Sequence, residues 1–197
     1  VRFDAAAPLA LKNDRIAGKT LDDRAHVAVM ARALELLKDR NLHCTAVFCA
    51  TVQEEFSGLG AKTGAYQIRP DIAVAIDVTH ARMPSATEFE SFDFDKVVLT
   101  KGSNAHPKLF SLIEDAAKEM NVPYDAEIAI GHSGTDAWDM QVAGCGAASA
   151  ILSTPVRYMH TSVETLCTKT LDNHAKVLVQ LLCSLGPDWE EKLCLDA

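Results

Sequence analysis

The chain has 197 residues, of which 48% are hydrophobic and 23% are charged, a balance typical of globular proteins. Its formal net charge of −8 and its lack of clustered Lys and Arg argue against a nucleic-acid partner, because phosphate binding needs basic clusters. No uninterrupted apolar stretch approaches the roughly 18 residues of a membrane span, so we expect no membrane partner either.

The N-terminal residues do not have the pattern of a signal peptide. Asp4 and Pro8 interrupt the apolar residues, and the polar residues 12–15 follow where a cleavage site would lie. The six cysteines show no CxxC spacing, which favours reduced thiols and a cytoplasmic location. The chain begins at Val1 rather than Met, and we therefore expect a fragment or a processed chain.

Helical and strand-like patterns alternate along the first part of the chain. Apolar residues recur at helical spacing over 22–41, with two acidic residues at the start, and predict a helix there. The apolar run 42–51 is typical of a buried strand. A helix over 57–67 and a second buried strand over 71–78 follow.

The same alternation continues to the C-terminus. Strands are predicted over 96–100, 127–130 and 147–153, and helices over 106–120, 135–142 and 168–185. The tail 186–197 has no assignment, although Trp189 and Leu193 suit a short docking helix. The alternation predicts one α/β domain with a layered sheet and short connections.

Acidic residues and one histidine follow the predicted strands or open a predicted helix. In an open α/β sheet these positions converge on one crevice, where several carboxylates would repel one another unless a cation lay among them. A divalent metal is the simplest such cation. The residues concerned are Asp22, Asp23, Glu54, Glu55, Asp77 and His160.

Each of these residues also has an ordinary structural explanation. An Asp pair at a helix start commonly interacts with the helix dipole, two glutamates after a strand commonly form a solvated turn, and a single histidine is commonly a surface or core residue. Asp77 is the most informative, because a carboxylate that ends a buried apolar strand must be paired, capped or metal-bound. The remaining histidines show no ligand spacing.

A glycine-rich turn at 131–136 offers a competing chemistry. Ser133 lies between a predicted strand and a predicted helix, as in the G-x-S-x-G turn of serine hydrolases, but Thr135 replaces the final glycine. A serine hydrolase that uses Ser133 with His160 or His174 is therefore disfavoured. The alternative is a turn beside the site that contacts substrate through Gly134, Thr135 and Asp136.

Five motifs in order resemble those of the tetrahedral, or glutamyl, aminopeptidases, some of which were once called endoglucanases. They are GKTLDDR, TVQEEFSGLGAKTGAY, PDIAVAIDVTH, GTDA and TPVRYMHTSVE, and the resemblance covers residues 17–185. It implies a dinuclear metallopeptidase with the α/β fold of zinc peptidases, a three-layer sandwich of the phosphorylase/hydrolase-like type with a mixed central sheet.

The resemblance assigns the metal ligands residue by residue. Asp22 resembles the carboxylate that bridges two metals, and Glu55 and His160 resemble ligands of one of them. Asp77 resembles a ligand of the other metal. Zinc or cobalt is implied, and manganese also suits these oxygen and nitrogen donors.

Two further residues resemble catalytic residues of the family. Asp23 resembles the residue that follows the bridging aspartate through a non-proline cis peptide. Glu54 resembles the general base, which takes a proton from a metal-activated water and returns it to the leaving amine.

The chain departs from the family pattern upstream of Lys19. The family has a further metal-binding histidine in an H-x-D motif and an inserted β domain that forms dimers, and nothing before Lys19 matches either. Residues 1–197 therefore resemble the C-terminal half of a catalytic domain. We expect a usable site at Asp22, Glu55 and His160, and an incomplete site with only Asp22 and Asp77.

The resemblance implies a metal-dependent aminopeptidase that removes N-terminal residues from short peptides, in a family that forms dodecamers. The alternative is an inactive, truncated scaffold with the same fold. A glycosidase is disfavoured, because the adjacent carboxylates of Glu54 and Glu55 would not flank a glycosidic bond at the required separation. The sequence does not specify the preferred N-terminal side chain.

Overall fold

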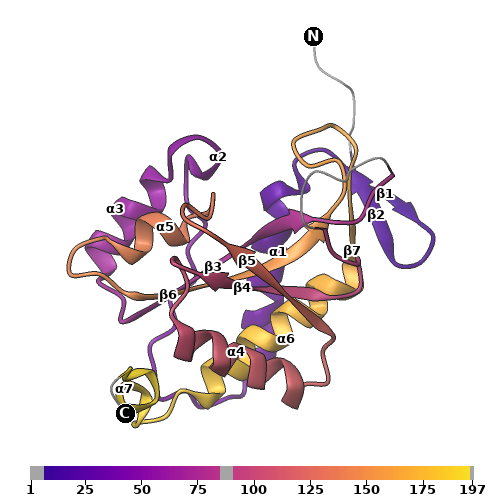
Figure 1. Ribbon diagram of the computed structural model, residues 1–197. Coiled ribbons are helices and arrows are strands. Elements are labelled where there is room, and N and C mark those ends of the chain that lie inside the picture. Colours follow the sequence, from indigo (N-terminus) through magenta and orange to yellow (C-terminus); the bar gives the residue numbers. More distant parts are fainter. Residues whose placement is uncertain (1–6, 85–90, 196–197) are drawn as a thin grey trace.

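The computed structural model describes residues 7–84 and 91–195 (Figure 1). In chain order the elements are β1 (Leu9–Leu11), β2 (Arg15–Gly18), α1 (Leu21–Leu37), α2 (Glu54–Ser57), α3 (Leu59–Ile68), β3 (Ile72–His80), β4 (Val97–Gly102), α4 (Pro107–Glu119), β5 (Tyr124–Ala129), α5 (Ala137–Gln141), β6 (Ala148–Val156), β7 (Glu164–Cys167), α6 (Thr168–Ser184) and α7 (Trp189–Leu193).

The main sheet has four strands in the order β3-β6-β4-β5. β3 runs parallel to β6 along its whole length, from the pair Ile72 and Ala148 to the pair His80 and Val156. β4 is parallel to β5 but antiparallel to β6. The predicted α/β class with a mixed central sheet is thus confirmed.

Helices cover both faces of this sheet (Figure 1). On β6, Ala150 and Leu152 pack into a cluster with α1, α4 and α6, whereas Ile151 packs against Ala137 of α5. Neighbouring strand residues point to opposite faces, so an unbroken apolar strand requires a cover on each side. The result is the three-layer sandwich that the resemblance implied.

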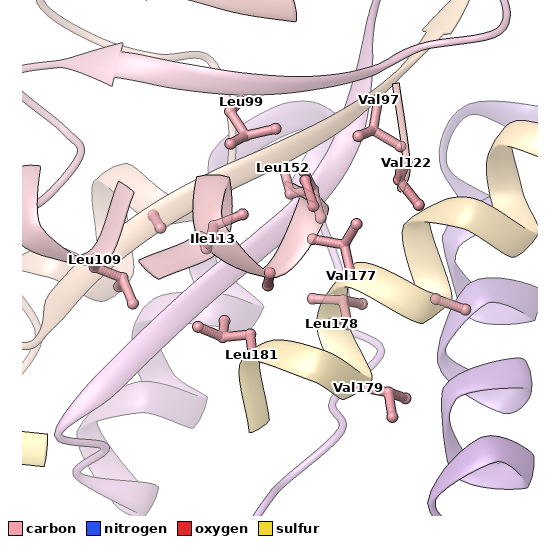
Figure 2. Packing of buried hydrophobic residues seen from close by; sticks show 14 of the residues in the cluster. Val97, Leu99, Leu109, Ile113, Val122, Leu152, Val177, Leu178, Val179 and Leu181 are labelled. Atoms are coloured by element: carbon pink, nitrogen blue, oxygen red, sulfur yellow. The ribbon is translucent and has the colours of Figure 1, made fainter. Parts of the chain in front are cut away.

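The largest hydrophobic cluster lies between the sheet and the helices α1, α4 and α6 (Figure 2). Leu152 and Leu109 have no exposed surface, and Leu99 is 1% exposed. Burial of each such side chain contributes about 1.5–3 kcal/mol to the free energy of folding. Leu193 of α7 is also buried in this cluster, which confirms that the tail docks as a short helix.

A second, three-stranded sheet was not predicted. It has the order β1-β2-β7, with antiparallel pairs throughout. Its strands are three or four residues long, too short for a period of two to stand out in the sequence. No helix among the described residues is long and apolar enough to cross a membrane.

The strand predicted over 42–51 is wrong. These residues form no strand, and no backbone hydrogen bond joins them to another described residue. The prediction rested on composition, but a strand also needs a neighbour with which to exchange hydrogen bonds. The prediction that Asp77 ends its strand is also wrong, because β3 continues to His80.

Candidate metal centre

A cavity of about 310 Å³ lies beside α2, β3 and the loop that follows β6. Most of the predicted site residues meet there, although they come from five separate parts of the chain. Its lining includes Asp22, Glu54, Glu55, Asp77, Gly134, Thr135 and His160.

Three potential ligands gather on one side of the cavity. The His160 Nε2 atom lies 3.2 Å from Asp22 Oδ2 and 3.3 Å from Glu55 Oε2. One ligand atom from each of the three residues falls within 4.8 Å of the others. Three protein ligands of this kind, with an open position for water, are typical of catalytic zinc sites.

A second cluster shares Asp22 and consists only of carboxylates. Ligand atoms of Asp22, Asp23 and Asp77 also lie within 4.8 Å of one another. The peptide bond between Asp22 and Asp23 is cis, as the resemblance implied. Asp23 was expected only as a catalytic residue, and its presence in this cluster makes it a third possible ligand.

The backbone around these residues departs from regular structure. Asp22 and Asp23 have non-helical dihedral angles at the start of α1. His160 has φ +61° and Gln53, just before α2, has φ +63°. Positive φ is uncommon for residues other than glycine and is concentrated at functional sites.

Gly60 fixes the position of α2 and its two glutamates. Its N–H donates to the Val52 carbonyl at 3.1 Å, and a Cβ at this residue would lie only 2.3 Å from the same oxygen. Only glycine allows this approach. The close contact between Gly60, at the start of α3, and Val52, just before α2, therefore fixes where α2 begins. Glu54 and Glu55 are the first two residues of α2.

Glu164 links the two segments that carry Asp22 and His160, and sequence reasoning did not assign it a role. Its carboxylate is buried and accepts the N–H groups of Leu21 at 2.6 Å, Asp22 at 3.1 Å and His160 at 2.9 Å. Nothing in the sequence distinguishes this glutamate from a solvated one, because its partners lie far away in the chain.

A buried chain of hydrogen bonds extends inward from Asp23. Asp23 contacts the Nδ1 atom of His26, whose Nε2 atom lies 3.0 Å from the Thr154 hydroxyl. Thr154 in turn lies 3.1 Å from His174 Nδ1. Both histidines are essentially fully buried, and burial lowers the pKa of His26 to about 3. Sequence reasoning assigned neither histidine to the metal site.

The carboxyls of the cavity hold protons more tightly than isolated acids. Burial, followed by repulsion from Asp22, raises the pKa of Asp23 to about 9. Burial, followed by repulsion from Asp23, raises the pKa of Asp77 to about 9 as well. The pKa of Asp22 rises to about 6, chiefly through burial and the charge of Glu55. A cation among these groups would reverse the effect.

Glu54 lies beside the ligand clusters without belonging to either. Burial, with added repulsion from Asp136 and Glu55, raises the pKa of Glu54 to about 7. A carboxyl with a pKa near neutrality can both accept and return a proton.

The three predicted substrate-binding residues do not lie together. Gly134 and Thr135 line the cavity, but Asp136 does not. Asp136 faces a neighbouring groove, where its Oδ2 atom accepts the Thr51 hydroxyl at 2.5 Å. Thr135 Oγ1 accepts the N–H of Ala137 at 3.2 Å, so this threonine also stabilises the start of α5.

Ser133 lacks the neighbours of a nucleophile. Its hydroxyl contacts Asn104 and Thr135, and no histidine of the described residues is among its hydrogen-bond partners. His174, one of its two potential bases, is buried against Thr154.

The donor set fits a divalent metal. It combines carboxylate oxygens and an imidazole nitrogen, the ligands that zinc and related ions use, and neither cluster contains a lysine or an arginine that would balance its carboxylates. The raised pKa values of Asp23 and Asp77 are the behaviour expected of such ligands without their cation.

Comparisons with known proteins identify a peptidase family. Residues 3–177 match the family described as M42 glutamyl aminopeptidase. The lysyl aminopeptidase of Pyrococcus furiosus is 35% identical over 178 residues, which cover 90% of this chain and 51% of that protein. An aminopeptidase structure from Desulfurococcus kamchatkensis superimposes with a TM-score of 0.80 at 33% identity, over 94% of this chain and 54% of the other.

A third relative is described by the assemblies that it forms. The TET1 peptidase of Pyrococcus horikoshii, described as able to form a tetrahedron or a large octahedral shell, is 26% identical with a TM-score of 0.75. The match covers 91% of this chain and 53% of that one. The chain thus spans about half the length of the relatives that it matches.

Proposed function

The chain belongs to the M42 glutamyl aminopeptidase family, and we propose that its acidic cavity is the catalytic centre of a metal-dependent aminopeptidase acting on short peptides. The observation that carries this proposal is the approach of Asp22, Glu55 and His160 to within 4.8 Å, beside a glutamate whose pKa lies near 7. Because the chain spans about half of its relatives, the activity is proposed for the protein that contains this domain.

Asp22, Glu55 and His160 would hold the first metal ion. Asp77, with Asp22 and now Asp23, would contribute to a second. Zinc or cobalt is proposed, with manganese also suited to these donors. A bound divalent ion supplies Lewis acidity, which polarises a peptide carbonyl and lowers the pKa of water.

Glu54 would move the proton. At neutral pH a carboxyl with a pKa of about 7 is present in both forms, so it can accept a proton from the attacking water. It can then return that proton to the amine that leaves. Asp23 would serve catalysis as a ligand of the second ion, held in place by its contact with His26.

Gly134 and Thr135 would contact the substrate, since both line the cavity that the acids surround. Asp136 would contact the substrate from the neighbouring groove, which it lines together with Glu54. A homo-oligomer and a cytoplasmic location are proposed for the complete protein, the first by analogy with the assembling TET1 relative.

The test compares the complete protein that contains this domain with its Glu54→Gln variant. Metal content is measured together with the hydrolysis of leucine, glutamate and aspartate anilides, with and without added zinc or cobalt. We expect near-stoichiometric metal in both proteins, and a loss of turnover in the variant by at least about 100-fold. Glu190→Gln, an exposed change on α7, serves as the control.

Two results would contradict the proposal. Loss of metal along with activity in Glu54→Gln would make Glu54 a ligand rather than a base. Stoichiometric metal without any turnover in the unmodified complete protein would favour the alternative of an inactive scaffold. Reversible inhibition by a chelator is expected, whereas inhibition by a serine-directed reagent would restore Ser133 as a candidate.

A further inference from the structure

A row of three buried polar side chains runs from Asp23 into the layer between the main sheet and the helices α1 and α6, which lie side by side (Figure 1). This polar row consists of His26 of α1, Thr154 of β6 and His174 of α6. The three residues are 1%, 0% and 0% exposed, respectively. The catalytic proposal uses only the contact between His26 and Asp23.

The polar row occupies a place where the fold otherwise has apolar residues. Thr154 lies on the same face of β6 as Leu152 and Val156, which are buried in hydrophobic clusters. A buried polar side chain costs free energy unless its hydrogen bonds are made, and an apolar side chain would pack there without that cost. One such bond is missing, because His174 Nε2 has no partner among the described residues. Stability alone therefore does not explain the polar row.

The order of the hydrogen atoms along the polar row follows from the end at Asp23. An aspartate that binds a metal ion is ionised and only accepts hydrogen bonds, so His26 Nδ1 must carry a hydrogen. Complete burial disfavours the charged form of both rings, which leaves His26 Nε2 as an acceptor. The Thr154 hydroxyl donates to that nitrogen at 3.0 Å and accepts the His174 Nδ1–H at 3.1 Å. Every donor in the polar row then points toward Asp23.

The reverse order is unfavourable at both ends of the polar row. It would place a lone pair of His26 Nδ1 against the Asp23 carboxylate, which repels it. It would also leave a buried N–H at His174 Nε2 without an acceptor among the described residues. Because a hydroxyl has one hydrogen, the N–H that His174 gives to the Thr154 oxygen directs that hydrogen toward His26. His174 therefore influences Asp23 through the two residues between them.

We propose that Thr154 and His174 are positioning residues, which hold the imidazole between them and Asp23 as a hydrogen-bond donor and thereby set the affinity of the second metal ion. That ion is the one of the proposed function, on which this inference rests. A donor at Asp23 Oδ1 fixes the orientation of the carboxylate and leaves Oδ2 for the ion.

The second ion depends on such orientation more than the first. In the described part of the chain its cluster offers only carboxylates, whereas the first cluster includes the imidazole of His160. Each carboxylate is also repelled by its neighbours, so an unrestrained Asp23 would turn away from the others. The restraint that the polar row supplies acts against this repulsion.

The test is a cobalt titration of the complete protein that contains this domain, after removal of metal, followed by the visible absorption of bound cobalt. Thr154→Val removes the hydroxyl and keeps the branched shape, whereas Thr154→Ser keeps the hydroxyl. We expect Thr154→Val to weaken the second ion by about 10–100-fold, with the first unchanged, and Thr154→Ser to stay within about threefold of the unmodified protein. His160→Ala, which removes a ligand of the first cluster, identifies the absorption of the first ion.

Thr170→Val is the matched control. Thr170 is also 0% exposed, and its hydroxyl donates to the Phe94 carbonyl at 2.6 Å, while neither residue belongs to a ligand cluster. This variant should lose stability in urea, as Thr154→Val does, but should bind both cobalt ions normally. The comparison separates the loss of any buried hydroxyl from the loss of the one in the polar row.

Three results would overturn the inference and leave the proposed function standing. They are an unchanged second affinity in Thr154→Val, an equal weakening in Thr154→Ser or Thr170→Val, and a single bound ion in the unmodified protein. Failure of the unmodified protein to bind any cobalt would overturn the proposed function as well.

If Thr154→Val does not fold, His174→Asn and His174→Leu decide the question. The side-chain amide of asparagine still donates toward Thr154, whereas leucine has no donor. We expect the second ion to bind nearly normally in His174→Asn and about 10–100-fold more weakly in His174→Leu. Equal affinities in these two variants would overturn the inference.

Discussion

Asp22 belongs to both ligand clusters, and the residues around it determine whether metal can bind. Its neighbours are mostly acids, so the site depends on a cation for electrostatic balance. The histidine that completes the first cluster is 67% exposed, and its position depends on the loop backbone rather than on packing. Substitutions at His160 itself and at Glu164, which accepts the His160 N–H, test this dependence.

His160→Ala should abolish tight metal binding, since it removes the only nitrogen donor of the first cluster. We expect the metal affinity to fall by at least about 100-fold. Removing a group that only hydrogen-bonds to a ligand usually costs about 10–100-fold, and loss of the ligand itself should cost more. Isothermal titration with zinc measures this. His43→Ala is the control, and equal affinities in the two variants would refute His160 as a ligand.

Glu164→Gln should weaken both the fold and the site. The carboxylate accepts three backbone N–H groups, and an amide in its place would turn one donor toward them. We expect a loss of about 2–4 kcal/mol in the free energy of unfolding and about 10–100-fold in metal affinity.

Urea unfolding and metal titration measure these effects, with Glu190→Gln as the exposed control. An unchanged metal affinity together with lower stability would restrict Glu164 to a structural role.

Among the elements, β6 is an interior strand of the main sheet and contacts elements on all sides. It pairs with β3 and β4, and its alternate side chains reach the helices on both faces of the sheet. Burial on both faces makes β6 almost continuously apolar, which is why its pattern was readable in the sequence.

Leu152→Ala should therefore be costly. Leu152 is fully buried at the centre of the cluster in Figure 2, and its truncation leaves a cavity that the surrounding elements cannot close. We expect a loss of about 2–5 kcal/mol in the free energy of unfolding, measured in urea. Leu34→Ala, at a residue that is 54% exposed, should change it by less than about 0.5 kcal/mol. Similar losses in the two variants would contradict the assigned core.

Several acidic side chains are buried near the cavity, and their protonation links the stability of the whole molecule to pH. Asp23 and Asp77 have pKa values of about 9 in the folded state, raised from 3.8. The folded state then binds protons more tightly than the unfolded state. The stability from these groups is complete below about pH 4 and is lost as pH rises toward 9.

In chelator, the melting temperature should therefore fall between pH 5 and pH 8. Each such carboxyl contributes a slope of about 1.4 kcal/mol per pH unit, which is at least about 2 °C for a chain of this size. Added zinc should raise the melting temperature more at pH 8 than at pH 5. Asp77→Asn should make the metal-free slope shallower. A flat pH profile in the unmodified chain would contradict the raised pKa values.

The sequence alone determined the local features, because they depend on periodicity and on short-range chemistry. The long helices 106–120 and 168–185 and the buried strands 71–78 and 147–153 were found within a few residues of α4, α6, β3 and β6. Most of the acidic residues around the cavity could also be named from the sequence, because acidic residues next to apolar strands are unusual in any fold.

Tertiary structure decided what depends on distant partners. The carboxylate of Glu164 acquires its role from backbone groups more than 140 residues away in the case of Leu21 and Asp22. Asp136 turned out to line the groove, although its neighbours Gly134 and Thr135 line the cavity. Segment 42–51 has the composition of a strand but forms none, because a strand exists only when a second one supplies its hydrogen bonds.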